Sequence, residues 1–316
     1  MSGKTTETVR ADEAGIDRAA AILCAGGLVA VPTETVYGLA ARADSEQAVA
    51  GIYNAKGRPD FNPLIVHVSG LEQAESLAQF SDIARVVAEL CWPGPLTLVL
   101  PRRENAPLAQ AVSAGLPTVA LRMPAHKTMR ALLSAVGIPL AAPSANRSQA
   151  ISPTTADHVA QSLGGRIELI LDAGPCEQGL ESTILAIRGG GQWDVLRPGP
   201  VDVESIYRHL FDRPLPMSTS PRTIEAPGQL AQHYSPGKPL RLAAREAAED
   251  EFLIGFGSVK GDCSLSEEGD LALAAARLYA CLHAGAASDK SRIAVAPVPE
   301  QGIGAAINDR LRRAAA

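Results

Sequence analysis

The sequence is poor in aromatic side chains and in cysteine, and it lacks any long apolar run. Aromatic residues make up 4% of the 316 residues and the formal net charge is −5, so the chain offers nucleic acid neither a stacking platform nor a basic stripe. The five cysteines form no C-x-x-C pair and no histidine stands at metal-ligand spacing beside them, which favours a reducing compartment and no structural zinc. Because every apolar run is shorter than about 18 residues and residues 1–15 are polar, we expect a cytoplasmic protein without a membrane segment.

Three common catalytic motifs are also missing. The sequence contains no G-x-x-x-x-G-K-[ST] phosphate loop, so ATP, if it is a substrate, is held in another way. It contains no G-x-S-x-G elbow and no H-E-x-x-H pair, which removes the usual supports of serine hydrolysis and zinc catalysis. No metal site is identifiable from the sequence.

Short apolar runs alternate with helical patterns through residues 1–210. Fully apolar strands separated by helices are typical of an α/β layer whose sheet is covered by helices. The last two runs are joined by Gly189-Gly190-Gly191 and indicate an antiparallel hairpin, so we expect a twisted, mixed sheet. The expected strands cover residues 28–31, 64–68, 96–100, 118–121, 140–142, 169–171, 183–187 and 194–196; the expected helices cover 11–25, a segment from 45, 71–78, 82–91, 126–136, a segment after 154 and one from 203.

The sequence pattern changes after residue 210. Residues 211–239 carry prolines at 214, 216, 221, 227, 236 and 239 and little periodicity, which indicates a linker stiffened by proline. Residues 240–316 then predict a second, smaller α/β domain, with strands over 252–256 and 293–295 and helices over 271–284 and 303–314. The expected domains are therefore 1–210 and 240–316, joined by the linker.

Polar loops follow several of the apolar strands, where open α/β sheets bind their ligands. Each loop taken alone also has an ordinary structural reading, as a turn, a helix cap or a satisfied core histidine. If they meet in one cleft, their cations neutralise about four negative charges, and the arginines match carboxylate and phosphate oxygens. The loops are 32–39, Lys56 to Pro59, 61–63 with His67, 141–148 with Ser152, Arg122, 181–183, and Arg197 to Gly199.

These loops carry the resemblance to a known family. The motifs P-T-E-T-V-Y-G-L, K-x-R, N-P-L-I-V-H, W-P-G-P-L-T, A-P-S-A-N, E-S-T-I and, in the linker, H-Y-S-P occur in this order. In them the sequence resembles the threonylcarbamoyl-AMP synthases, from about Gly26 to Pro200 and again at 226–228 and 233–236. The resemblance implies a YrdC-like catalytic domain, a linker and a small Rossmann-like C-terminal domain.

The resemblance also implies the residues of the site. Lys56, Arg58, Ser144 and Asn146 would be catalytic. The L-threonine site would use Thr35, His67, Arg122, the backbone at Ala142, and Ser182. The ATP site would use Lys56, Arg58, Asn62, Thr118, Ser144, Asn146, Ser152, Arg197 and Tyr234.

The implied reaction joins L-threonine, bicarbonate and ATP into threonylcarbamoyl-adenylate and pyrophosphate. The class would be nucleotidyltransferase. Other proteins would transfer the threonylcarbamoyl group to tRNA, so tRNA is only an indirect partner. A Mg²⁺ ion bridging the phosphates is expected, and it needs few protein ligands. His67 and Glu34 are candidates for a general base only because they stand beside binding motifs.

Other functions stay open at this stage. The same fold could serve a double-stranded RNA or tRNA-binding module without catalysis, a domain that handles carbamoyl phosphate, or a regulatory module that binds adenine nucleotide. The linker departs from the family pattern, since Gln229 and Leu230 follow Gly228 where methionine and a basic residue are usual. His233-Tyr234 stands alone in this linker and motivates the hypothesis of a lid that closes over the substrates.

Overall fold

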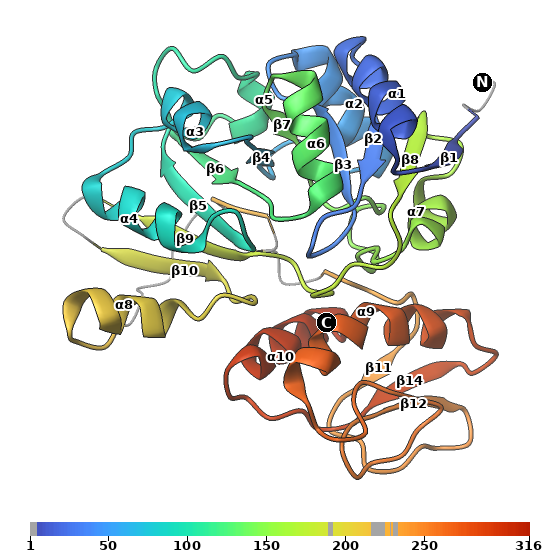
Figure 1. Cartoon of the computed structure of the whole chain (residues 1–316). Helices are drawn as coiled ribbons and strands as arrows, with labels where there is room; N and C mark the ends of the chain where they lie inside the picture. The colour runs from blue at the N-terminus through green and yellow to red at the C-terminus, as the bar shows by residue number, and fades with distance from the viewer. Residues whose placement is uncertain (1–4, 189–191, 216–224, 228, 230–232) are drawn as a thin grey trace.

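The chain forms two α/β layers of unequal size (Figure 1). A computed structural model describes residues 5–188, 192–215, 225–227, 229 and 233–316. The larger layer contains a sheet of ten strands and the smaller a sheet of four. No helix in these described ranges is long and apolar enough to cross a membrane.

The ten-stranded sheet is mixed, as the sequence predicted. Its order is β1-β8-β2-β3-β7-β4-β6-β5-β9-β10. Strands β4 and β6 pair in parallel, whereas β7 lies antiparallel to both β3 and β4, and β10 forms the expected antiparallel hairpin with β9. The strands are β1 (Glu7–Arg10), β2 (Val29–Val31), β3 (Gly38–Arg42), β4 (Ile65–His67), β5 (Leu96–Pro101), β6 (Thr118–Arg122), β7 (Leu140–Ala141), β8 (Leu169–Asp172), β9 (Thr183–Ile187) and β10 (Trp193–Arg197).

Several helices of the larger layer begin at polar capping residues. The side chains of Asp12, Ser45, Ser81 and Thr155 each accept a hydrogen bond from a backbone N–H of the first turn, which satisfies a donor that the helix leaves free. The helices are α1 (Glu13–Cys24), α2 (Glu46–Lys56), α3 (Leu71–Leu77), α4 (Asp82–Cys91), α5 (Gln110–Ser113), α6 (Lys127–Val136), α7 (Ala156–Leu163) and α8 (Val203–Phe211).

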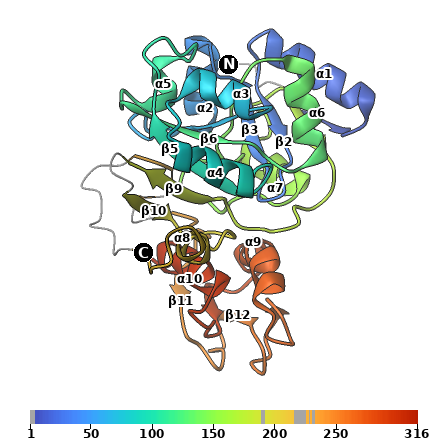
Figure 2. The ribbon, with the colours of Figure 1, turned by 60° about the vertical axis from the view of Figure 1, so that its left-hand side comes forward.

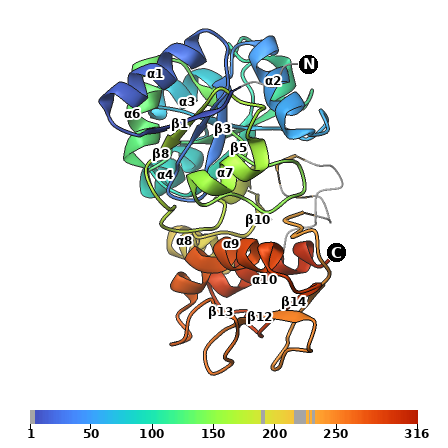
Figure 3. The same cartoon turned by 90° about the vertical axis from the view of Figure 1, so that its right-hand side faces the viewer.

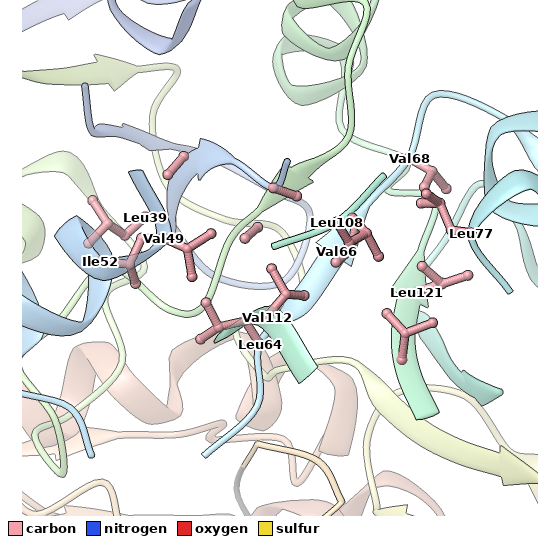
Figure 4. Close-up of a cluster of buried hydrophobic side chains, with 14 of the residues drawn as sticks. Leu39, Val49, Ile52, Leu64, Val66, Val68, Leu77, Leu108, Val112 and Leu121 are labelled. Carbon is pink, nitrogen blue, oxygen red and sulfur yellow. The ribbon is translucent and has the colours of Figure 1, made fainter. Parts of the chain in front are cut away.

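A buried apolar cluster holds α2 against the sheet. Ile52 of α2 packs beside Leu39 of β3, and the cluster extends past Leu64 to Val66 of β4 and Leu121 of β6 (Figure 4). Each of these side chains is at most 1% exposed, and burying one contributes about 2 kcal/mol. This packing fixes the ends of β4 and β6, at which functional side chains stand.

The four-stranded sheet is parallel throughout, with the order β11-β14-β12-β13. Figures 1, 2 and 3 all show its two helices between this sheet and the larger layer. A small parallel sheet with its two helices on the face toward the first layer confirms the second, smaller α/β domain that the sequence predicted. The elements are β11 (Leu240–Arg241), β12 (Glu251–Gly255), β13 (Cys263–Ser264), β14 (Arg292–Val295), α9 (Leu271–Ala287) and α10 (Ile303–Ala314).

Four strands were absent from the sequence-based expectation. The segment expected as the loop 32–39 contains the start of β3, which pairs antiparallel with β2. β1 is a polar edge strand, and β11 and β13 have two residues each. The three glycines expected at the hairpin turn lie outside the described residues, as do residues 216–224, 228 and 230–232 of the linker. The domain boundaries at 210 and 239 stay predictions.

Candidate active site

The polar loops converge on one small cavity at the ends of β4, β6, β9 and β10. Its free volume is about 40 Å³, which is room for about three water molecules. The cavity is lined by Thr33, Thr35, Val36, Gly38, Arg58, Ile65, His67, Arg122, Ala142, Pro143, Ser144, Glu181, Ser182, Arg197, Pro227, His233 and Tyr234.

Strand register brings the first two functional side chains together. His67 ends β4 and Arg122 ends β6, and the two residues are direct partners in the parallel pairing of these strands. Strand β7 pairs antiparallel with β4 on its other side, with Ala141 opposite Val66, and Ala142 N donates to Ile65 O before the chain enters the loop that carries Ser144. His67, Arg122, Ala142 and Ser144, which come from three segments distant in sequence, all line the cavity.

Arg122 forms a buried pair with Glu34. Its Nη2 donates to Glu34 Oε1 at 2.5 Å and its Nη1 donates to Thr35 Oγ1 at 3.0 Å. Burial alone would raise the pKa of Glu34, but the Arg122 charge and hydrogen bond outweigh it and lower that pKa. Glu34 is therefore ionised, and it also accepts the backbone N–H of His126. A carboxylate held in this way neutralises Arg122 and is a poor proton acceptor.

His67 is neutral at pH 7. Burial, with a smaller contribution from the Arg122 charge, lowers the pKa of His67 to about 3. Its Nδ1 is buried without a hydrogen-bond partner within the described chain. An orphaned imidazole nitrogen that lines a cavity is a ready contact for a polar ligand.

Lys56 lies behind the cavity wall and does not line it. Its Nζ donates to Ser144 O and to Asn146 O, both at 2.5 Å, and the side chain is buried. Burial, and then the Arg58 charge, lower the pKa of Lys56 well below its usual value. Asn146 in turn donates through Nδ2 to Ala150 O at 2.7 Å. Lys56 and Asn146 thus fix the loop that carries Ser144. Of the four cations at the predicted loops, Arg58, Arg122 and Arg197 line the cavity and Lys56 does not.

Arg58 reaches the cavity from the turn after α2. Gly57 ends this helix in the left-handed conformation, with φ 60°, which glycine adopts without strain. The guanidinium of Arg58 then donates to Asn62 O at 3.2 Å and to Pro63 O at 2.9 Å. Burial lowers the pKa of Arg58 to about 10, so it remains a cation. Asn62 Oδ1 is buried without a partner in the described chain.

Arg197 and Ser182 form the opposite wall. Arg197 Nη2 donates to Ser182 Oγ at 3.1 Å and its Nε donates to Ser182 O at 3.1 Å. Ser182 Oγ also lies 2.8 Å from Thr97 Oγ1. Ser152 is buried behind this wall, where its hydroxyl donates to Glu181 Oε1 at 2.5 Å.

The end of the linker closes the cavity. His233 Nδ1 and Tyr234 Oη are buried without a partner in the described chain, and the two rings lie 4.0 Å apart. Tyr234 has a φ of 64°, unusual for a residue with a side chain. The backbone beside it is held, since Ser235 N donates to Gln149 O at 2.8 Å.

Most of the site residues expected from the sequence meet here. Those that line the cavity are Thr35, Arg58, His67, Arg122, Ala142, Ser144, Ser182, Arg197 and Tyr234. Lys56, Asn146 and Ser152 support its walls through the hydrogen bonds above, and Asn62 accepts from Arg58. Thr118 begins β6, four residues before Arg122, or about 13 Å along the strand. Sequence reasoning missed Tyr279 and Arg310 of the second domain, which donate hydrogen bonds to Glu181, because no local pattern marks them.

Among the described residues no three His, Cys, Asp or Glu side chains gather as a metal site. The two carboxylates nearest the cavity, Glu34 and Glu181, are already paired with arginines. A metal ion at this cavity therefore would have to be held mainly by a ligand and water.

Two family models match the chain. The family model for Sua5, YciO and YrdC proteins, described as Telomere recombination, matches residues 21–199. The model described as the threonylcarbamoyl-AMP synthase C-terminal domain matches residues 201–316. Fold and cavity thus define a two-domain protein of the Sua5 class.

The similar proteins narrow the class further. The chain is 39% identical to threonylcarbamoyl-AMP synthase of Pyrococcus abyssi, over 96% of this chain and 95% of that protein. It is 37% identical to the Bacillus subtilis threonylcarbamoyl-AMP synthase, over 98% and 95%. The crystal structure of P. abyssi Sua5 complexed with L-threonine covers 98% of this chain and 97% of its own, with a TM-score of 0.87 and 36% identity. The chain belongs to the threonylcarbamoyl-AMP synthase family.

None of these similarities favours the alternatives that the sequence left open. The P. abyssi and B. subtilis relatives are named as synthases and match along nearly the whole chain. The expectation of threonylcarbamoyl-AMP synthesis is confirmed at the level of the family.

Proposed function

We propose that the cavity binds L-threonine, bicarbonate and ATP and converts them into threonylcarbamoyl-adenylate and pyrophosphate, as a nucleotidyltransferase. The observation that carries this proposal is the convergence of Arg58, Arg122 and Arg197 on one buried cavity together with the unpartnered nitrogen of His67. Buried cations of this kind suit a triphosphate and an amino-acid carboxylate.

Threonine would occupy the side of the cavity formed by β4, β6 and the start of β9. Its carboxylate would meet Arg122, whose charge Glu34 already balances in part. Its hydroxyl and amine would meet His67, the hydroxyls of Thr35 and Ser182, and the backbone at Ala142. The complex of P. abyssi Sua5 with L-threonine supports a threonine site in a protein of the same fold.

The nucleotide would bind along the wall formed by Arg58, Ser144 and Arg197. Lys56 and Asn146 would act through the loop that they hold, because their polar atoms already bond to backbone carbonyls. The remaining nucleotide contacts are assigned to Asn62, Thr118, Ser152 and Tyr234.

The chemistry needs positioning and charge stabilisation more than a covalent nucleophile. The threonine amine and bicarbonate give a carbamate and water. A carbamate oxygen then forms a bond to the α-phosphorus, the bond from this phosphorus to the β-phosphate oxygen breaks, and pyrophosphate leaves with the electron pair. Each cationic contact that strengthens as charge shifts to pyrophosphate contributes about 3 kcal/mol, or about a hundredfold in rate.

Magnesium would arrive with the nucleotide. The carboxylates near the cavity are paired with arginines, whereas Mg²⁺ keeps several waters and takes phosphate oxygens readily. When bound, it would neutralise charge on the phosphates. Ser144 and Thr35 are neutral oxygen donors that line the cavity and would be available to it.

The enclosed volume of about 40 Å³ would hold only part of the substrates, so we include in the proposal a wall that moves when they bind. His233 and Tyr234 are the part of the wall best suited to move, because they belong to the linker and carry buried polar atoms that have no partner in the described chain. They would act as a lid that closes over the substrates and excludes water. Deleting residues 211–316 without any loss of turnover would contradict this lid.

The experiment that tests the proposal is a pyrophosphate-release assay on the full chain. Release should require threonine, bicarbonate, ATP and Mg²⁺ together. Release from ATP without threonine would indicate another activity of the same fold. The adenylate would then pass to proteins that modify tRNA, and the cytoplasm remains the expected location.

A further inference from the structure

Two helices of the second domain hold a carboxylate of the first. Tyr279 of α9 donates to Glu181 Oε2 at 2.8 Å, and Arg310 of α10 donates through Nε to the same oxygen at 2.9 Å. Ser152 donates to the other oxygen, Glu181 Oε1. Arg310 is 0% and Glu181 5% exposed. Every oxygen of this carboxylate is therefore engaged, away from water, by two domains.

The backbone just before Glu181 packs closely against helix α9. Gly179 has a φ of 67°, and a Cβ added there would lie 2.4 Å from Ala276 O of α9. No side chain fits that gap without moving the helix or the segment. The close approach is independent of the ionic contacts, and both concern the same short segment, 179–182.

The segment continues directly into the cavity wall. Ser182 follows Glu181 and receives two hydrogen bonds from Arg197. Burial would raise the pKa of Glu181, but the charges of Arg310 and Arg197 outweigh it and lower this pKa to about 2. Glu181 is thus a full anion that attracts both arginines. Without Arg310, the anion would have Arg197 as its main cation.

We propose that Arg310 and Tyr279 are positioning residues for the synthase site: they neutralise and fix Glu181, so that Ser152 and Ser182 stay in place and Arg197 stays free to meet the anionic substrate. The inference rests on the proposed function. It gives the second domain a defined part in the reaction, because the site is complete only when α9 and α10 are docked on the segment 179–182.

Charged and titratable groups face Glu181 from several described elements, and His283 of α9 lies one residue farther, with Nε2 3.2 Å from Ser152 O. Arg310 and Asp309 come from α10, and Nη1 of Arg310 donates to Asp309 Oδ2 at 2.8 Å. Arg197 comes from β10 and Tyr279 from α9. The linker supplies two aromatic neighbours, one of which, Tyr234, has its ring 5.5 Å from the Arg310 guanidinium carbon. The other is His233, whose pKa burial lowers to about 3, so that it is neutral at pH 7.

The test compares four single variants and one double variant of the full chain with the wild type. Arg310→Met removes the cation, Tyr279→Phe removes one hydroxyl and keeps the ring, and Gly179→Ala wedges the segment away from α9. The matched control is Arg241→Met. It removes another arginine from a Glu pair in the same domain, and its partner Glu251 retains Arg292. Steady-state kinetics are measured at a temperature at which circular dichroism shows every variant to be folded.

The expected results separate positioning from stability. Arg310→Met should lower kcat/KM for ATP about a hundredfold at pH 8, since Arg197 is then drawn to Glu181. Part of this loss should be regained as the pH falls toward the pKa of Glu181, which rises when the charge of Arg310 is removed. Adding Glu181→Gln to Arg310→Met should rescue turnover at pH 8. Tyr279→Phe and Gly179→Ala should raise the KM values about tenfold.

Two results would overturn the inference. One is a loss in Arg310→Met no larger than in Arg241→Met, and the other is a loss that neither acid nor Glu181→Gln restores. Failure of the proposed function is a different result: the wild type itself would then release no pyrophosphate. In that case the threonine dissociation constants of the same variants, measured by calorimetry, still test whether the second domain positions the site.

Discussion

Replacing Lys56 by methionine tests whether this buried amine acts by holding the loop of Ser144. Methionine keeps the length of the side chain and removes its hydrogen bonds to the carbonyls of Ser144 and Asn146. Each carbonyl left without a partner costs about 2 kcal/mol, so the folded state should lose about 4 kcal/mol. For a domain of this size the melting temperature should fall by about 10 °C.

The loop should also lose its fixed position, and the pyrophosphate-release assay measures the consequence. We expect turnover to fall at least about a hundredfold at a temperature where the variant is folded, because a displacement of about 1 Å at a reacting centre has an effect of this size. Lys238→Met is the matched control. Lys238 also donates to two carbonyls, Ser288 O at 2.7 Å and Gly285 O at 3.1 Å, but in the second domain. The Lys238→Met variant should lose stability and keep the turnover of the wild type. Equal turnover in both variants would refute the reasoning.

Three further predictions concern charge. Arg122→Gln leaves buried Glu34 without its cation, so unfolding measurements should show a loss of about 3 kcal/mol, and the KM for threonine should rise much more than the KM for ATP. Chelating Mg²⁺ with EDTA should abolish pyrophosphate release without changing the melting temperature, as expected of an ion that arrives with ATP. Burial, with the charge of stacked His158 adding, lowers the pKa of His283 to about 4. In the unfolded chain the pKa of a histidine is higher, about 6.5, so the unfolded state binds a proton first as the pH falls. Urea unfolding should therefore show that the protein loses about 2 kcal/mol of stability between pH 7 and pH 5. The His283→Asn variant should lose less stability over the same range.

Much of the fold could be predicted from local pattern. Helix α10 begins and ends where its apolar spacing predicted, and the parallel strands β4 and β6 were visible as fully apolar runs. Strand β3 was missed because its start lies within the motif that also forms the cavity wall. A short strand of small residues such as Gly38 and Ala40 has no period that distinguishes it from a loop.

The site was predictable as a set of residues and not as a set of contacts. The motifs indicated which cations to expect, yet nothing in the sequence around Lys56 shows that its amine donates hydrogen bonds to two backbone carbonyls. The same holds for Arg310, which meets Glu181 across 129 positions of the chain. The Lys56 contacts depend on how distant segments of the first domain fold together, and the Arg310 contact depends on how the two domains pack; no local spacing in the sequence shows either.

The most direct measurement uses isotope-labelled bicarbonate with threonine and ATP, followed by mass spectrometry of the products. The account predicts one label in an adduct that contains both threonine and AMP, formed with an equal amount of pyrophosphate and absent when any substrate is omitted. Release of pyrophosphate together with unlabelled AMP alone, or an adduct that forms without threonine, would contradict it.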